Sequence, residues 1–264
     1  MIEKSYAKVN IFLKITGIKE FEGKELHTFN SRFMLLKNMY DTIEFVPQKC
    51  DSFTIEGLDD IKLEDNIIYK AYKALNKYTG DLDILEFFYN HKVVVKKNIP
   101  MGAGLGGGSS NAATFMKMVH KFCNLTISID ELANIGAKVG ADIPFFIYGY
   151  DSANVSGFGD IIEPFDEELL EFDIYTPPIH CDTSIVYKTF RENFLKDINP
   201  NSGATLMLNN SYDILTSNFA PSKLNDLYKA ALLAYPELKD YQKDGWYFSG
   251  SGSSFFRLKE TYGN

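Results

Sequence analysis

Cysteine and histidine are scarce in this chain of 264 residues, and neither is spaced as a metal site requires. The three cysteines, Cys50, Cys123 and Cys181, lie far apart and form no paired motif. The four histidines show no metal-ligand spacing either. We therefore expect no metal site built by the protein. We also expect buried free thiols and a reducing, cytoplasmic location.

Long apolar runs and an excess of positive charge are also missing. No stretch approaches the ~20 apolar residues of a transmembrane helix. The start, Met1-Ile2-Glu3-Lys4-Ser5, lacks the apolar stretch that follows the basic residues of a signal peptide. The net charge of −8 argues against a general nucleic-acid binder. We expect a small-molecule partner, and neither nucleic acid nor membrane.

Glycine, by contrast, is concentrated in one segment. Five glycines fall between Gly102 and Gly108, directly before Ser109-Ser110-Asn111 and an alanine pair. Val93-Val94-Val95 precedes them, so the pattern predicts a strand, a loop and a helix that begins at Ala112 with Ser-Ser-Asn as its cap. Such a loop can turn its N–H groups toward an anion at the positive end of a helix. The nearest candidate anion is the phosphate chain of a nucleotide.

Other glycine-loop families fit this segment less well. Gly102, Gly104 and Gly107 match the G-x-G-x-x-G pattern, but no acidic residue ends a second strand about twenty positions later. The Walker pattern needs lysine where Gly108 stands. The protein-kinase motifs H-R-D and D-F-G do not follow the loop.

Periodicity along the rest of the chain predicts strands and helices without strict alternation. Expected strands cover residues 7–15, 33–36, 42–46, 172–176, 246–248 and 255–258. Expected helices cover residues 66–78, 112–119, 128–139, a segment from 142, 185–194 and 224–234. The Gly- and Ser-rich residues 151–160 look like a crossing between domains. The mixed order predicts an α+β protein.

Several short motifs occur in a fixed order around the glycine loop. They are Ala7-Lys8-Val9-Asn10, Glu64-Asp65-Asn66, the loop Pro100–Ser110, Gly140-Ala141-Asp142-Ile143-Pro144 and Ser249-Gly250-Ser251-Gly252-Ser253. This set resembles the GHMP family of small-molecule kinases over nearly the whole chain, most weakly between residues 197 and 221. The Ala-Lys-x-Asn start, the position of His27, Glu64-Asp65-Asn66 and the Gly-Ala-Asp-x-Pro motif together narrow the resemblance to the branch whose substrate carries a cytidine diphosphate group.

The resemblance implies a two-domain GHMP kinase fold with the active site in the cleft between its domains. An N-terminal, ribosomal-S5-domain-2-like ATP domain is expected at residues 1–160, and a C-terminal, ferredoxin-like substrate-side domain at residues 161–264. The implied activity is transfer of the γ-phosphoryl group of ATP to a hydroxyl of a small molecule. Mg²⁺ is expected to accompany ATP without a protein ligand set of its own. A monomer or weak homodimer is expected.

The matched motifs also imply roles for individual residues. Asp142 is expected to be the general base and Lys8 the cation beside it, with a plain helix cap as the alternative for Asp142. Expected ATP contacts are Asn66, Lys97, Pro100, Met101, Gly102, Ala103, Gly104, Leu105, Gly106, Gly107, Gly108, Ser109 and Ser110. Asn66 as a helix cap and Lys97 as a surface charge stay open as alternatives. Gly104 and Gly107 are expected at positive φ.

At the substrate end, the resemblance implies contacts from Asn10, His27, Thr183 and Tyr187. Tyr187 replaces a usual phenylalanine, and Leu26 stands where the family usually has a tyrosine that stacks on cytosine. Asn225-Asp226-Leu227 is expected to be structural, and the loop at Gly250–Gly252 to approach the substrate or steady the cleft.

Three other functions remain in competition at this point. A GHMP kinase for another alcohol is the nearest, a non-catalytic nucleotide-binding regulator of the same fold is the second, and a dinucleotide oxidoreductase is the third.

Overall fold

The computed structural model describes residues 1–21, 23–80, 82–217 and 219–259, and it has the predicted α+β composition. The chain forms two compact units. The first contains Met1–Ala7, Lys37–Ile99 and Gly106–Tyr150, and the second contains Lys8–Leu36, Pro100–Leu105 and Asp151–Asn264. Residues 260–264, at the end of the predicted second domain, lie outside the described residues. Segments of the two units alternate along the sequence, and the long strands β1 (Ile2–Phe21) and β2 (Lys24–Pro47) each contribute residues to both.

Strand β1 is longer than the predicted 7–15 and is buried on both faces from Ala7 to Ile15. Val9 and Ile11 form its apolar side, as the alternation indicates. The alternate residues Lys8, Asn10 and Lys14 are only 3%, 2% and 8% exposed. The polar face of this strand is therefore an interior face, which a polar residue occupies only when it finds partners there.

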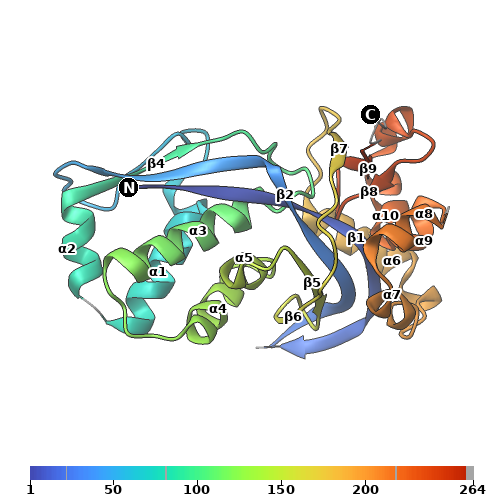
Figure 1. Ribbon diagram of the computed structural model, residues 1–264, viewed down its shortest axis with the longest axis horizontal. Coiled ribbons are helices and arrows are strands. Elements are labelled where there is room, and N and C mark those ends of the chain that lie inside the picture. The colour runs from blue at the N-terminus through green and yellow to red at the C-terminus, as the bar shows by residue number, and fades with distance from the viewer. Residues whose placement is uncertain (22, 81, 218, 260–264) are drawn as a thin grey trace. The chain divides into compact units, whose positions relative to one another are not determined.

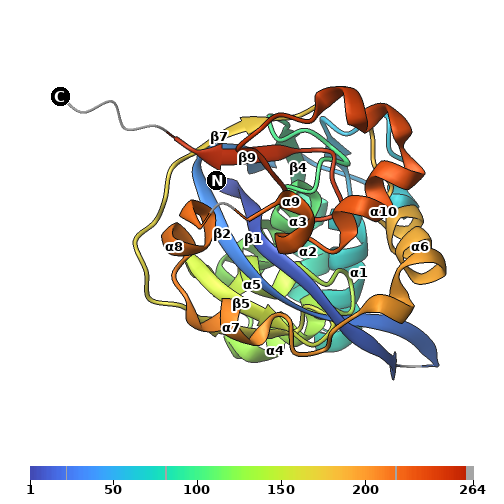
Figure 2. The ribbon, with the colours of Figure 1, turned by 90° about the vertical axis from the view of Figure 1, so that its right-hand side faces the viewer.

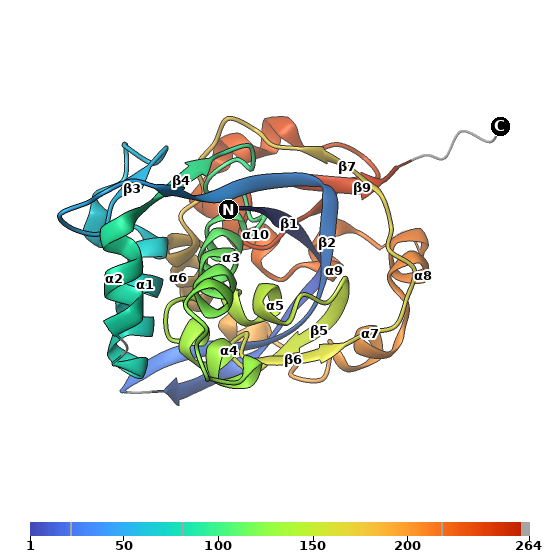
Figure 3. The ribbon, with the colours of Figure 1, turned by 60° about the vertical axis from the view of Figure 1, so that its left-hand side comes forward.

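The first unit joins a small sheet to a group of helices. Strand β2 pairs antiparallel with β4 (His91–Lys96), and β4 pairs in parallel with β3 (Ile55–Glu56). The helices are α1 (Ile67–Thr79), α2 (Leu82–Asn90), α3 (Gly107–Phe122), α4 (Ile129–Ala137) and α5 (Ile143–Tyr148). Helix α3 packs against α1 and α5, and Figures 1 and 3 show α1 and α3 beneath β4. A cluster of aromatic rings lies in the core of this unit: Phe45 packs edge-to-face with Phe88 and Phe115, which stack on each other.

The second unit contains the other end of β2 and a separate three-stranded sheet. Here β2 pairs with β5 (Ser152–Ser156), and β5 pairs with β6 (Ile161–Pro164), both antiparallel. The separate sheet has the order β7-β9-β8, from Phe172–Tyr175, Phe255–Leu258 and Tyr247–Phe248. The helices are α6 (Thr183–Asn193), α7 (Ala204–Leu208), α8 (Ser211–Thr216), α9 (Pro221–Leu224) and α10 (Leu227–Ala234). Helices α6 and α10 pack side by side (Figure 2).

The structure corrects one local prediction and refines another. Helix α3 begins at Gly107 rather than Ala112, so Ser109, Ser110 and Asn111 lie within the helix and do not cap it. At the predicted crossing 151–160, the chain does pass from the first unit, which ends at Tyr150, to the second, and the segment also contains the paired strand β5 from Ser152. In both places tertiary packing overrides a low intrinsic propensity of Gly and Ser for regular structure.

Within the described part of the chain, no helix combines the length and the apolar character that a membrane span requires.

Candidate functional site

Lys8 lies in the interior of the second unit, where several partners fix the position of its ammonium group. Its Nζ donates to Oδ1 of Asn10 over 2.6 Å and to the carbonyl oxygen of Gly104 over 3.3 Å. It also lies 4.5 Å from the centroid of the Phe33 ring. The amide of Asn10 in turn donates to Oγ of Ser31 over 3.0 Å. A buried ammonium that is held in this way is a preorganised positive charge beside the glycine loop.

The first half of that loop is shaped by neighbours in the same unit. Gly102 and Gly104 both have positive φ, 62° and 72°. A Cβ at Gly102 would lie 2.1 Å from Nδ1 of His180, and one at Gly104 would lie 2.1 Å from the carbonyl oxygen of Ser249. Glycine is therefore required at both positions, because the backbone has positive φ and because neighbouring atoms leave no room for a Cβ.

The second half of the loop leads into α3 in the first unit. Gly106 is the N-cap in the left-handed region, with φ 69°. Gly107 is helical, so its predicted positive φ is wrong; it is small because a Cβ there would lie 2.8 Å from Cγ2 of Ile99. Gly108 is exposed, and a Cβ there would meet nothing closer than Ile67 at 3.8 Å. Of these three glycines, Gly108 is the one that the fold does not require.

The loop at Gly250–Gly252 is held by Asn225, which confirms that this asparagine is structural. Its Nδ2 donates to the carbonyl oxygens of Phe248 and Gly250 over 2.9 and 2.8 Å. The hydroxyl of Ser251 lies 2.9 Å from that of Thr183, the first residue of α6. The predicted substrate contact Thr183 and the serine-glycine loop are therefore neighbours within one unit.

Asn66 caps α1, which was the structural alternative for this residue. Its Oδ1 accepts from the backbone N–H of Ile68 over 2.9 Å. The residue is 1% exposed, and its Nδ2 has no hydrogen-bond partner among the described residues. A buried donor without a partner is costly, and a ligand acceptor at that point would remove the cost.

Lys97 is not a solvated surface charge. Its ammonium group forms an ion pair with Asp41 and donates to Oδ1 of Asn111 over 3.1 Å. Asn111 also donates to Oγ of Ser5, whose hydroxyl donates to Ser110 over 2.8 Å. Lys97 and the first turn of α3 thus belong to one hydrogen-bonded network in the first unit.

Asp142 stands at the N-cap position of α5, and its side chain makes no capping hydrogen bond. Pro144 follows within the first turn, which removes one of the N–H groups that a cap would serve. The side chain of Asp142 is half-buried. The role of a plain helix cap is therefore wrong for its carboxylate.

His27 packs in the second unit against the rings of Tyr187 and Phe190, with centroid distances of 5.1 and 6.1 Å. Burial, aided by the nearby positive charge of Arg191, lowers the pKa of His27 below its ordinary value of 6.5. Its Nε2 is buried and has no hydrogen-bond partner among the described residues. A neutral imidazole with an unpartnered nitrogen is suited to a polar, uncharged ring such as a nucleobase.

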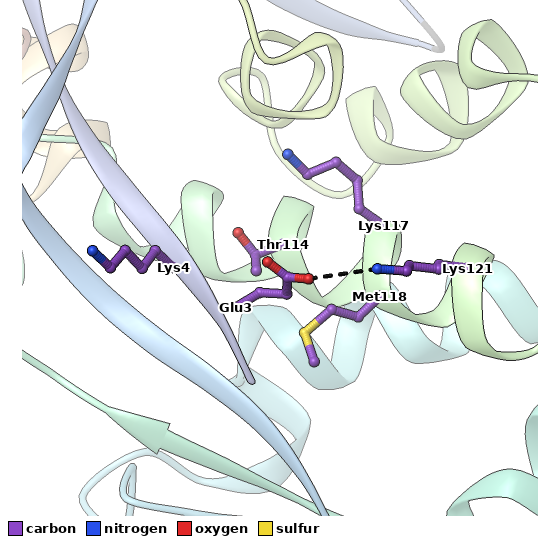
Figure 4. A pocket seen from close by; sticks show the side chains of 6 residues that line it. All are labelled: Glu3, Lys4, Thr114, Lys117, Met118 and Lys121. Carbon is purple, nitrogen blue, oxygen red and sulfur yellow. Dashed lines mark ion pairs between the residues drawn. The ribbon is translucent and has the colours of Figure 1, made fainter. Parts of the chain in front are cut away.

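A separate pocket of roughly 230 Å³ lies between the start of β1 and α3, and no predicted site residue lines it. Its lining consists of Glu3, Lys4, Thr114, Lys117, Met118 and Lys121 (Figure 4). Lys121 pairs with Glu3 at 3.8 Å, and Lys117 donates to the carbonyl oxygen of Phe146. Burial lowers the pKa of Lys117. In Figure 4 the Lys4 ammonium group points away from Glu3 and Lys121, so the lysines do not converge on one point.

The described residues contain no group of three or more His, Cys, Asp or Glu side chains arranged to hold a metal ion. Sequence reasoning named Asn111 and Ser249 only within motifs, and it missed four other residues that shape the candidate site: Asp41, Ser5, Ser31 and His180. They carry no motif of their own, and they matter because the fold brings them to residues that do.

Residues 66–150 match the N-terminal domain family of the GHMP kinases. The chain is 48% identical over 256 residues to a 4-diphosphocytidyl-2-C-methyl-D-erythritol kinase of Sulfurovum sp., with 97% of this chain and 98% of that protein covered. It is 47% identical to the protein of the same name from Sulfurimonas denitrificans, with 97% and 96% covered. A crystal structure of 4-(cytidine 5'-diphospho)-2C-methyl-D-erythritol kinase matches with a TM-score of 0.71 at 26% identity, covering 98% of this chain and 90% of that one.

Proposed function

The chain belongs to the family of the 4-diphosphocytidyl-2-C-methyl-D-erythritol kinases, and we propose that it phosphorylates the 2-hydroxyl of diphosphocytidyl-methylerythritol with ATP, in the non-mevalonate route to isoprenoids. The observation that carries the proposal is the glycine loop. Gly102, Gly104 and Gly106 adopt left-handed conformations, and the loop leads directly into the N-terminus of α3, in a chain that matches these kinases over 97% of its length. Membership of this family argues against the oxidoreductase alternative.

In the proposed reaction, the substrate hydroxyl oxygen attacks the γ-phosphorus of ATP. The bond between that phosphorus and the β,γ-bridging oxygen breaks, and ADP leaves. Asp142 takes the proton of the hydroxyl, and Lys8 stabilises the negative charge that develops on its oxygen. Phosphoryl transfer depends mainly on positioning and charge stabilisation, which suits a site with one base and one fixed cation.

The loop Pro100–Ser110 is proposed to hold the phosphates, with Asn66 and Lys97 near the adenine. The unpartnered Nδ2 of Asn66 and the exposed Gly108 support this assignment. Mg²⁺ would arrive with ATP as part of the co-substrate. A cation that is bound mostly by phosphates and water needs few protein ligands. It would neutralise charge on the phosphates.

His27 and Tyr187 are proposed to bind the cytosine ring, and Asn10 and Thr183 to contact other parts of the substrate. The low pKa of His27 and its unpartnered Nε2 support a neutral base as its partner. We further propose a cytoplasmic enzyme, monomeric or weakly dimeric, with an ATP domain at residues 1–160 and a substrate-side domain at residues 161–264. Cys50, which is half-buried, and the buried Cys181 carry free thiols, as a reducing compartment would leave them.

A phosphoryl-transfer assay tests the proposal. Purified protein is incubated with Mg²⁺-ATP and either diphosphocytidyl-methylerythritol or methylerythritol phosphate, and the products are weighed by mass spectrometry. We expect one added phosphate on the cytidine-containing substrate and little on the other. Equal turnover of both would contradict the cytidine requirement. Absence of turnover with either would favour a non-catalytic regulator.

A further inference from the structure

Asp41 is a fully buried carboxylate that the proposed reaction does not use. Its side chain is 0% exposed, and it lies near the end of β2 in the first unit. One oxygen accepts the backbone N–H groups of Asn98 and Ile99 over 2.6 and 2.8 Å. The other accepts from Nδ2 of Asn111 over 2.9 Å and pairs with the ammonium group of Lys97.

These four donors lie on both sides of the glycine loop. Asn98 and Ile99 directly precede Pro100, and Asn111 directly follows Ser110. A single carboxylate therefore fixes both ends of the loop Pro100–Ser110. Hydrogen bonds to an ionised acceptor are about twice as strong as neutral ones, so this arrangement restrains the loop ends more than neutral contacts would.

Asp41 cannot itself contact a ligand. A carboxylate has about four lone-pair sites, and four donors within the protein occupy them. Burying a charge is unfavourable unless its partners compensate for lost hydration. The partners that compensate here are the loop ends and Lys97, so the effect of Asp41 on function passes through them.

The position of Lys97 explains why a negative charge is needed there. Its Nζ lies 3.4 Å from the point where a Cβ of Gly107 would stand, at the first residue of α3. The N-terminus of a helix carries partial positive charge, which repels a cation. Asp41 offsets this repulsion. Asp41 and Asn111 engage two of the three ammonium donors, and the side chain of Lys97 remains 19% exposed.

We propose that Asp41 is a positioning residue for ATP: it fixes Lys97 and both ends of the glycine loop in the geometry that accepts the nucleotide. This inference rests on the proposed function, because it takes the ligand of the loop to be ATP. It predicts that loss of the Asp41 charge weakens ATP binding while binding of the cytidine end is unchanged.

The test compares Asp41→Asn with the wild type by calorimetric titration of Mg²⁺-ATP and, separately, of CDP as a probe for the cytosine site. Asparagine has nearly the same volume, but it turns an NH₂ group toward donors and leaves Lys97 without a counter-charge. We expect Kd for ATP to rise roughly 10- to 100-fold, which corresponds to about 1.4–2.8 kcal/mol and lies within the range for leaving a hydrogen-bonding group without its partner. Kd for CDP should stay within about twofold.

Glu167→Gln is the matched control. Glu167 is 4% exposed, pairs with the buried Arg32 and accepts from Ser152 and Ser211 in the second unit. The Glu167→Gln substitution should lower thermal stability without changing Kd for ATP. A folded Asp41→Asn variant with unchanged ATP affinity would overturn the inference, as would a parallel loss of ATP and CDP binding.

Two further variants keep the test decisive. If Asp41→Asn does not fold, Asn111→Ala removes one of the four contacts, and it should weaken ATP binding by a smaller factor; unchanged affinity would again overturn the inference. If Asp41 acts through Lys97, Asp41→Asn should add little to the effect of Lys97→Met on ATP binding, and additive effects would contradict this route. Failure of the wild type to bind ATP would overturn the proposed function itself.

Discussion

Lys8 and Asn10 lie on the same face of β1, and the ammonium group of Lys8 donates to Oδ1 of Asn10 over 2.6 Å. Both residues are almost fully buried, so each has lost most of its hydration. The amide of Asn10 is fixed in turn by Ser31, over 3.0 Å. Asn10 therefore orients the proposed catalytic cation, whatever contact it makes with substrate.

This pairing predicts non-additive kinetics. Lys8→Met should lower kcat by roughly 10²-fold, the range for loss of one group that stabilises transition-state charge. Asn10→Ala should lower kcat less, because the lysine remains but is poorly oriented. The double variant should be little slower than Lys8→Met alone. Steady-state kinetics at saturating ATP measures this, and multiplicative losses would show that the two residues act separately.

The second prediction separates catalysis from helix capping at Asp142. Asp142→Ala should lower kcat by roughly 10²-fold or more, the range for loss of a general base. Its melting temperature should stay close to that of the wild type, because the side chain does not cap α5. Loss of a working cap would instead cost about 0.5–2 kcal/mol of stability. A near-normal kcat in a folded Asp142→Ala variant would show that Asp142 is not the general base.

A third prediction concerns pH and His27. Burial first, and then Arg191, lowers the pKa of the folded imidazole below 6.5, so the unfolded chain takes up a proton that the folded chain resists. The contribution of His27 to stability is therefore complete above about pH 6.5 and is lost as the pH falls through the folded pKa. When unfolding by urea is measured between pH 7.5 and 5, the free energy of unfolding should fall more steeply with decreasing pH for the wild type than for His27→Gln. Equal dependence of the free energy of unfolding on pH in the two proteins would contradict the lowered pKa of His27.

Cytosine binding provides the fourth prediction. Tyr187 lies 5.1 Å from the ring of His27, while Leu26 is 37% exposed and offers no aromatic face. Base stacking is worth roughly 1–3 kcal/mol, so Tyr187→Ala should raise KM for the cytidine substrate roughly 5- to 150-fold, with a smaller effect on kcat. Tyr187→Phe keeps the ring and should preserve KM. Leu26→Tyr should lower KM.

Thermal unfolding provides the control for Tyr187. If Tyr187→Ala loses stability but keeps its KM, then the ring belongs to the core and another residue covers the base.

The fifth prediction uses the contrast between Gly107 and Gly108. Gly107→Ala should destabilise the protein, because Ile99 is buried and a Cβ would stand 2.8 Å from it. Gly108→Ala meets no close atom and replaces a poor helix former, so it should stabilise the fold by about 1 kcal/mol. If phosphate approaches α3 at this point, Gly108→Ala should nevertheless weaken ATP binding. Unchanged ATP affinity in this variant would place the phosphates elsewhere.

The sequence predicts what is local and misses what depends on strand pairing. The glycine loop, β4 and most helices follow from contiguous patterns, and the family follows from ordered motifs. The role of Asp41 cannot be predicted from the sequence, because it depends on the antiparallel register of β2 and β4, in which Thr42 pairs with Lys96. That register brings Asp41 to Lys97 across 56 positions of chain. The start of α3 was misplaced for a related reason, since packing against α1 and α5 stabilises a glycine-serine turn that propensity alone disfavours.

The pairing of β2 with β5 has a consequence for folding while the chain is being synthesised. Met34 pairs with Ser152, and translation adds roughly 5–20 residues per second, so the ribosome needs roughly 6–24 s to deliver the partner strand. During that interval this edge of β2 lacks its native neighbour and exposes backbone groups that can pair with other chains. Until residue 152 has emerged, this edge of β2 is therefore a site at which the nascent chain can associate with other chains.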